Sequence, residues 1–119
     1  MANITRYVNV KDKYIIPYYQ DLKDWMSDTN NEYIGAKEVT FINGEPFPKE
    51  NSVWYNPFKL TKNNVEECLV KYKKHILLKI KNENLLHKLI ELKGKNLGAI
   101  EKSELNHADV LIDLINFYT

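Results

Sequence analysis

His107 and Asp109 stand two residues apart near the end of the chain, and they are the pair in this sequence best suited to acid–base chemistry. An imidazole can take up or release a proton near neutral pH, and a carboxylate beside it can hold its tautomer and orientation. The pair lies at the predicted start of a helix, where free backbone N–H groups also favour an anion. A structural interpretation stays open beside this one: Asn106 and Asp109 cap the helix, and His107 is a surface residue of its first turn.

Arg6 is the single arginine of a sequence that contains 16 lysines. It alternates with Ile4, Val8 and Val10, so we expect it on the buried face of a strand. Arginine is rarely buried without a partner, and its planar guanidinium suits the phosphate or carboxylate of a ligand. An internal ion pair with one of the 16 acidic residues explains the same position, and the sequence leaves both interpretations open.

Aromatic residues gather in the stretch 45–58, which holds three of the four prolines and is predicted to be an irregular loop. Trp54 and Asn56 have the chemistry to stack on and hydrogen-bond a flat ligand such as a base or a sugar. In the alternative interpretation Trp54 and Phe58 anchor the loop to the core, and for Phe58 this alternative is favoured.

Motifs for other chemistries are missing from the sequence. It contains no glycine-rich phosphate loop, no H-E-x-x-H and no G-x-S-x-G. His75, His87 and the single cysteine, Cys68, lack the spacing of metal ligands. We therefore expect no metal site, no cofactor and no internal disulfide.

The composition, with 119 residues, 44% apolar side chains and a net charge of +1, is typical of one domain that spans residues 1–119. The near-neutral charge gives no general electrostatic case for nucleic acid, and the lysines of 71–81 are expected to form a solvated helix face. No apolar run suits a transmembrane helix, and the first residues lack the apolar core of a signal peptide. A cytoplasmic, intracellular location without a membrane partner is therefore expected.

The elements that position these residues follow from periodicity and turn signals. Alternating or short apolar runs predict strands over 4–10, 39–42 and 96–100, with a further short run at 33–35. The dipeptide Asn43-Gly44 predicts a hairpin turn.

Helical spacing predicts the remaining elements. One helix is expected to open at Pro17, and a long one over 63–80 to be capped by Asn63 with Glu66 in a capping box. A short helix over 85–92 and a last helix from Asn106 follow. Strands that alternate with helices predict an α/β fold: a small single domain with a short, mixed or mostly parallel sheet flanked by helices.

Five short segments resemble, in order and spacing, the motifs of one family. They are T-R-Y-V-N-V at 5–10, Y-I-G at 33–35, W-Y-N-P-F at 54–58, L-K-G-K-N-L-G at 92–98 and H-A-D-V-L at 107–111. On these segments the chain resembles the domain of unknown function 4326 family, which we associate with bacteria, phages and large DNA viruses. The resemblance covers nearly the whole chain and implies a viral or phage protein as one source.

The chain departs from the pattern of that family in its cysteines. Family members typically have C-W-C after the last glycine of the fourth segment, and a third cysteine directly before the histidine. The aligned residues here are Ala99, Ile100, Glu101 and Asn106, so a metal or redox cluster built on those thiols cannot form. The residues that the resemblance retains fall at strand ends and loops: Arg6, Asn9, Tyr33, Gly35, Trp54, Asn56, Pro57, His107 and Asp109.

Two functional interpretations stay open. In the first, the chain is a small-ligand-binding domain for an anionic, nucleotide-like ligand: Arg6 holds the anion, Trp54 stacks and Asn56 hydrogen-bonds, with Asn9, Tyr33 and Gly35 in the same pocket. If the site catalyses a reaction, His107 is the acid or base and Asp109 orients it, and hydrolysis or group transfer is favoured over redox chemistry. Whether the chain is an enzyme is left undecided.

The second interpretation is a non-catalytic viral or phage accessory protein that acts through protein–protein contacts, self-association included. It is motivated by the eight tyrosines, and the candidates for an exposed surface are Tyr18, Tyr19 and Tyr55.

Overall fold

The computed structural model describes residues 4–61, 63–101 and 105–119, and within them it contains five helices and five strands. In chain order these are β1 (Arg6–Asn9), α1 (Asp12–Ile15), α2 (Leu22–Ser27), β2 (Asn31–Tyr33), β3 (Thr40–Ile42), β4 (Glu45–Phe47), α3 (Val65–Asn82), α4 (Leu86–Glu91), β5 (Asn96–Ala99) and α5 (His107–Tyr118). The predicted order is confirmed, except that an unpredicted short helix, α1, precedes the first predicted one and the loop 45–58 begins with a strand.

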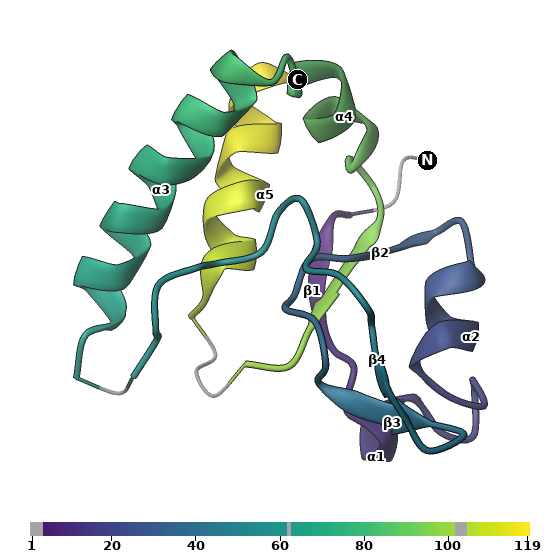
Figure 1. Cartoon of the computed structure of the whole chain (residues 1–119). Helices are drawn as coiled ribbons and strands as arrows, with labels where there is room; N and C mark the ends of the chain where they lie inside the picture. The colour runs from purple at the N-terminus through teal and green to yellow at the C-terminus, as the bar shows by residue number, and fades with distance from the viewer. Residues whose placement is uncertain (1–3, 62, 102–104) are drawn as a thin grey trace.

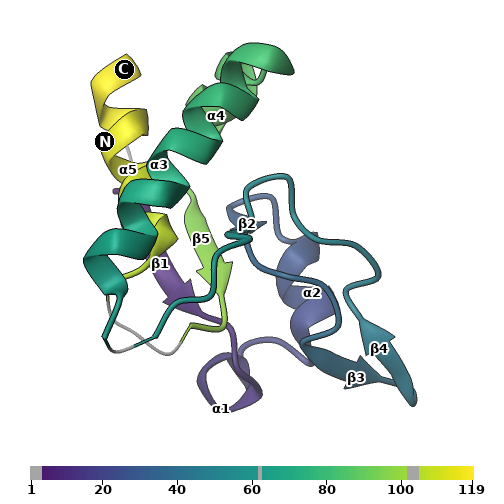
Figure 2. The same cartoon turned by 60° about the vertical axis from the view of Figure 1, so that its left-hand side comes forward.

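Three strands form the central sheet in the order β1-β5-β2, and all of them are parallel. Asn96 at the start of β5 pairs with both Arg6 and Asn31, so the three amino ends lie at one edge of the sheet and the three carboxyl ends at the other. Figures 1 and 2 show α3 and α5 side by side on one face of the sheet and α2 on the opposite face. This layered arrangement confirms the predicted α/β class.

Each face of the sheet has its own apolar core. The core on the side of α3, α4 and α5 includes Trp54, Tyr72, Ile76, Leu97 and Leu111. The core on the side of α2 is built from Val10, Ile15, Leu22, Trp25 and Tyr33. Gly98 in β5 allows Trp25 to pack directly against the strand, because a Cβ at this position would overlap the Trp25 ring.

The hairpin of β3 and β4 confirms the predicted turn. Asn43 and Gly44 have φ values of 53° and 80°, and positive φ at both central residues is the requirement of a type I′ turn. β4 lies in the stretch that was predicted to be irregular, and Pro46 is one of its residues. Proline is tolerated there because β4 pairs on one side only, in a sheet of two strands.

Two predicted helix starts are wrong. Pro17 does not open a helix: α2 begins at Leu22, because the carboxylate of Asp21 accepts a hydrogen bond of 2.8 Å from the backbone N–H of Asp24 and caps the helix there. The capping box of Asn63 and Glu66 does not form, since α3 begins at Val65 with Asn64 at its N-cap position. The Asn64 carboxamide oxygen instead accepts from the backbone N–H of Thr61 at 2.7 Å.

The longest described helix, α3, has the predicted division into a buried stripe and a lysine-bearing face. Cys68, Tyr72, Ile76 and Ile80 are buried, whereas the lysines at 71, 73, 74 and 81 are exposed. Neither α3 nor any other helix within the described ranges combines the length and apolarity needed to cross a membrane.

Candidate functional site

The carboxyl edge of the parallel sheet brings the first turn of α5 against the end of β2. The His107 side chain is fully buried, and its Nε2 lies 2.7 Å from the carbonyl oxygen of Ile34, the residue after β2. Its other ring nitrogen, Nδ1, lies 3.1 Å from Oε1 of Glu101, two residues after β5. His107 is therefore held between two segments that follow neighbouring strands, and it is not the surface residue of the structural interpretation.

The contact with Ile34 determines the tautomer of His107. A carbonyl oxygen can only accept, so Nε2 carries a hydrogen and donates it. Nδ1 then carries a second hydrogen only when the ring is an imidazolium. Nδ1 forms no well-aligned hydrogen bond with the described residues, although the Glu101 oxygen is close. Nδ1 and the Glu101 carboxylate therefore face each other at close range, which is the arrangement of an acid–base pair.

Glu101 is the member of this pair that a ligand can reach. The Glu101 side chain is 19% exposed and that of His107 is 0% exposed. Of the two side chains, only the Glu101 carboxylate is open to a molecule at this edge, whereas the His107 ring, which was expected to be the reacting group, is covered.

Two tyrosines border the same edge from the two faces of the sheet. The Tyr7 hydroxyl donates to the carbonyl of Ala99 at 3.0 Å, and the Tyr33 hydroxyl donates to that of Ala36 at 2.6 Å. Burial raises the pKa of Tyr7 to about 12, and the negative charges of Glu101 and Asp109 add to the rise. Burial also raises the pKa of Tyr33, again with a contribution from Glu101. The edge thus presents neutral hydroxyls beside carboxylates.

A glycine is required at position 35 because the Tyr33 side chain lies close to its backbone. A Cβ on Gly35 would lie 2.6 Å from the Tyr33 hydroxyl oxygen and 3.2 Å from the Ala99 Cβ. Gly35 is therefore needed for packing at this edge, and it offers a ligand no side chain of its own.

Asp109 caps α5 instead of orienting His107. Its Oδ2 accepts from the backbone N–H of Asn106 at 2.8 Å, while the Asn106 carboxamide oxygen accepts from that of Ala108 at 2.9 Å. This reciprocal arrangement is a capping box, as the structural interpretation expected. The carboxylate beside the His107 ring is that of Glu101, which sequence reasoning did not propose as a site residue. Its sequence signals were a position directly after the last predicted strand and its alignment with the second cysteine of the C-W-C that the family typically has.

Arg6 is exposed, which corrects the expectation that it lies on a buried face. It starts β1, an edge strand, and it is paired with Asn96 at the amino edge of the sheet. Asn9, at the carboxyl end of β1, is three residues further along the strand, or about 10 Å of backbone. Arg6 also shares its face with Val8 and Val10, which pack in the core on the α2 side, whereas His107 lies on the α5 side. Arg6 and His107 do not line one site.

Trp54 and Asn56 are held inside their loop. Trp54 is only 2% exposed, so it has no open face on which a ligand could stack. Its carbonyl accepts a hydrogen bond of 2.6 Å from the hydroxyl of Tyr72, whose ring lies 5.2 Å from the His107 ring. The Asn56 amide contacts Cys68 Sγ at 3.5 Å, and its oxygen accepts from the Phe58 N–H at 2.9 Å. Both residues are anchors of the loop; the alternative interpretation had proposed this role for Trp54 but not for Asn56.

The structure therefore gathers only part of the expected set. Tyr33, Gly35 and His107 meet at the carboxyl edge, and Asp109 caps the helix there. Asn9 ends β1 at the same edge, where its side-chain oxygen accepts from the Lys11 N–H at 3.1 Å. Within the described ranges, no three His, Cys, Asp or Glu side chains are grouped so that they could hold a metal ion.

The family model for Domain of unknown function (DUF4326) matches residues 19–117. This range includes Tyr33, Glu101 and His107, and it excludes β1 with Arg6 and Asn9. No curated protein and no solved structure matches the chain. Because the matched range spans most of the 119 residues, the chain belongs to the DUF4326 family.

Proposed function

We propose that this chain is a small-ligand-binding domain whose site is the carboxyl edge of the β1-β5-β2 sheet, with the Glu101 carboxylate as the group that meets the ligand. The observation that carries the proposal is the contact of 3.1 Å between Glu101 Oε1 and His107 Nδ1, on a ring whose Nε2 is already bound to Ile34. Ligands of parallel α/β sheets bind outside the carboxyl ends of the strands, which supports this location.

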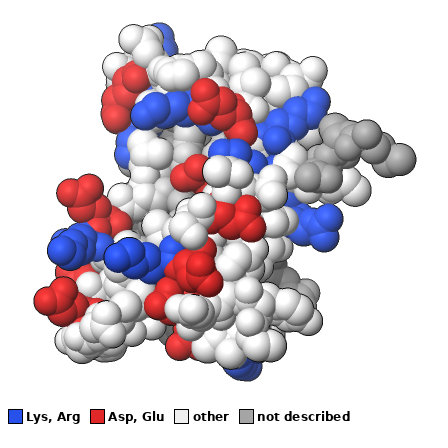
Figure 3. All heavy atoms as spheres, turned by 90° about the vertical axis from the view of Figure 1, so that its right-hand side faces the viewer, with Lys and Arg blue, Asp and Glu red and all other residues white. Residues whose placement is uncertain are grey.

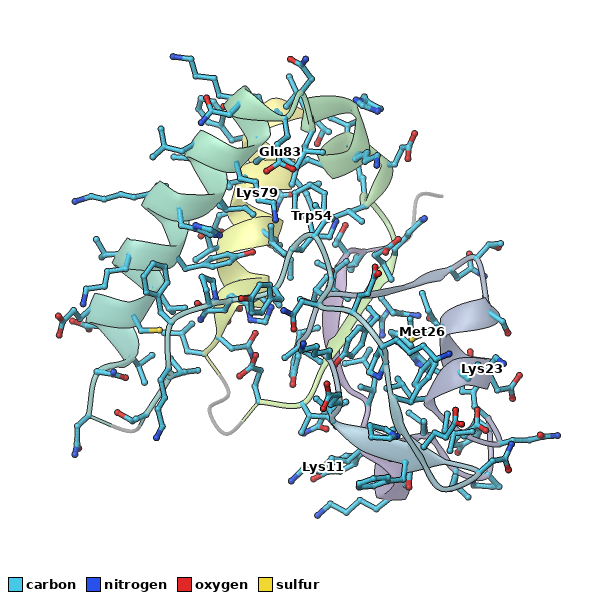
Figure 4. All side chains as sticks on the ribbon, viewed as in Figure 1. Lys11, Lys23, Met26, Trp54, Lys79 and Glu83 are labelled. Atoms are coloured by element: carbon cyan, nitrogen blue, oxygen red, sulfur yellow. The ribbon has the colours of Figure 1, made fainter. Side chains whose placement is uncertain are left out.

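The local charge restricts which part of a ligand meets Glu101. The negative charges of Glu101 and Asp109 both raise the pKa of Tyr7, so a phosphate placed near these carboxylates would be repelled. A hydrogen-bond donor, such as a ribose hydroxyl or the amino group of a base, suits the carboxylate instead. For a nucleotide-like ligand we therefore place the sugar or base at Glu101 and the phosphate at Lys11. Lys11 is exposed directly after β1, and Figure 4 shows it beside α1 at the lower end of the molecule, where the strands end.

His107 is a positioning residue in this proposal. Its Nδ1 faces the Glu101 carboxylate at 3.1 Å and holds that side chain in place, so that Glu101 can accept a proton from a bound hydroxyl and return it. Such a site suits hydrolysis or group transfer. Binding without catalysis needs the same contacts.

The test is a thermal-shift series with adenosine, cytidine and their 5′-monophosphates. A ligand at ten times its Kd stabilises the fold by about 1.4 kcal/mol, which is a measurable rise in Tm. We expect Glu101→Gln to abolish the shift by nucleosides and nucleotides, and Lys11→Gln to weaken only the shift by nucleotides. Arg6→Gln is the matched control and should behave as wild type, because Arg6 lies at the opposite edge. Shifts that survive Glu101→Gln but disappear in Arg6→Gln would overturn the location.

A second readout separates a role in binding from a purely structural role. If Glu101 meets the ligand, Glu101→Gln removes the stabilisation by adenosine while the Tm without ligand stays close to that of wild type. A variant that had only lost packing would show a lower Tm without ligand and an intact shift by adenosine.

Three exposed aromatic side chains favour the alternative, a viral or phage accessory protein that acts through protein–protein contacts. Tyr18, Phe41 and Phe117 are 84%, 72% and 79% exposed, whereas Tyr19 and Tyr55 are partly buried. The Tyr19 hydroxyl donates to Asp28 Oδ2 at 2.8 Å, so this hydroxyl is already used within the chain and is not free to contact a partner. Size-exclusion chromatography with light scattering tests self-association, and Phe117→Ser should abolish any concentration-dependent dimer. A monomer at every concentration would count against this form of the alternative.

A further inference from the structure

A polar cavity lies away from the Glu101 site, beside the amino ends of β2 and β5. Its volume is about 260 Å³, and it is enclosed by β2, α4, the segment that leads into β5 and the tip of the loop that carries Trp54. Its apolar floor is formed by Val53, Trp54 and Leu92. Figure 4 shows Trp54 rising from the tip of its loop toward the helices.

The rim of this cavity carries two charges of each sign. Glu32 and Glu91 supply carboxylates, and Lys88 and Lys95 supply ammonium groups. Figure 3 shows this side of the molecule, where acidic and basic side chains alternate around a hollow instead of gathering by sign. A ligand with one charge of either sign would be repelled by half of the rim, whereas a ligand with both charges has a partner for each.

The rim charges do not fully compensate one another. Glu32 is half-buried, and its closest described cation, the Nζ of Lys95, is 4.0 Å from its Oε1, the outer limit of an ion pair. Burial raises the pKa of Glu32, and the nearby Lys95 and Lys88 only partly oppose that rise. A carboxylate that is partly desolvated and loosely paired gains from a cationic donor brought to hydrogen-bond distance.

We propose that this cavity binds a small zwitterion with the size and chemistry of a free α-amino acid, its ammonium group at Glu32 and its carboxylate at Lys88 and Lys95. The volume lies below the range of about 300–1,000 Å³ that drug-sized ligands occupy, so a nucleotide does not fit here. On the apolar floor, Val53 is partly exposed and suits a small aliphatic side chain, while Trp54 and Leu92 lie buried beneath it. This site is independent of the one at Glu101, because it lies at the opposite edge of the sheet.

The two tryptophans make the test specific for this cavity. Trp54 lines it, whereas Trp25 is packed in the core on the α2 face. In nitrogen–proton spectra of the full chain titrated with L-valine to millimolar concentrations, we expect the indole signal of Trp54 to move and that of Trp25 to stay. Isovalerate lacks the ammonium group and valinamide lacks the carboxylate, so each should bind at least about tenfold more weakly than valine.

Variants of the rim complete the test. Glu32→Gln and Lys88→Gln should each weaken valine binding by about tenfold or more. Lys37→Gln is the matched control, because Lys37 is an exposed lysine outside the cavity whose ion pair with Glu38 is similarly long, at 3.9 Å. An unchanged Trp25 signal shows that each variant is folded. Because Lys88 is exposed, Lys88→Gln is expected to fold and keeps the test decisive if Glu32→Gln does not fold.

Three outcomes would overturn the proposal: no movement of the Trp54 signal, equal binding of valine and its singly charged analogues, or rim variants that bind as Lys37→Gln does. None of them bears on the nucleoside shifts at Glu101, so the two sites can fail separately.

Discussion

Replacing Tyr72 with phenylalanine tests the contact that joins the loop of Trp54 to the helices. Tyr72 is fully buried in α3, and its hydroxyl donates to the Trp54 carbonyl at 2.6 Å. Phenylalanine keeps the ring and its edge contact with His107, so the perturbation is confined to one hydroxyl. The Trp54 carbonyl is left in the core without this donor.

The expected loss follows from the cost of a buried acceptor without its donor, about 1–3 kcal/mol. Unfolding entropy of about 2.1 cal/mol/K per residue gives about 0.25 kcal/mol/K for this chain of 119 residues. The loss therefore corresponds to a fall in Tm of about 4–12 °C. Tyr18→Phe is the control: Tyr18 is 84% exposed, and its free energy of unfolding should change by no more than about 0.5 kcal/mol.

Urea unfolding, monitored by tryptophan fluorescence and by circular dichroism, measures both variants. We expect Tyr72→Phe to lower the midpoint with the m-value unchanged, because the surface exposed on unfolding stays the same. If Tyr72→Phe were no less stable than Tyr18→Phe, the Tyr72 hydroxyl would not anchor the loop, and α3 would not hold Trp54 in place through this hydrogen bond.

Three further predictions follow from the same contacts. Burial raises the pKa of Tyr7 to about 12 and also raises that of Tyr72, so the folded state prefers the neutral phenols. The stability of the fold should therefore hold below pH 10 and fall as pH rises from 10 toward 12. The measurement is a cooperative loss of near-ultraviolet circular dichroism that accompanies the ionisation signal at 295 nm. A complete phenol titration with the dichroism unchanged would contradict this. Gly98→Ala should cost about 1–3 kcal/mol in urea unfolding, since the new Cβ meets the Trp25 ring, and a neutral result would mean that the ring does not pack on β5 as described. Asn106→Ala removes the cap of α5 and should cost about 1 kcal/mol; an unchanged midpoint would show that the capping box adds nothing.

Local patterns in the sequence were sufficient for most of the fold. The alternation over 4–10 and 96–100, the Asn43-Gly44 turn and the apolar stripe around Tyr72 each encode a structure that depends on residues close in the chain. The predicted helix starts agree with the structure to within one residue for α4, which has no side-chain cap, and for α5, whose cap was identified correctly. Asn106 caps α5 as predicted. The start of α2 was predicted wrongly at Pro17, because several polar residues nearby could serve as a cap and the sequence does not show that Asp21 is the one used.

Burial at the ends of elements was the weaker prediction. Alternation assigned Arg6 to a buried face, but β1 is an edge strand and its first residue is exposed. Trp54 lay in an apparent loop of prolines and aromatic residues, yet it is among the most buried side chains. The periodicity of a segment shows which residues share a face, whereas the neighbours of that segment decide how far the face is covered.

The sequence by itself determined the α/β class, the order of its elements and the placement of His107 at the start of the last helix. Only the tertiary structure decided which carboxylate meets that histidine. Asp109 is nearer in the chain, but its carboxylate is used by the cap of α5, and Glu101 takes the place beside the ring. The other partner, the carbonyl of Ile34, is 73 residues away along the chain. Two strands must pair in parallel before Ile34, Glu101 and His107 come together, and no local pattern of residues specifies that pairing.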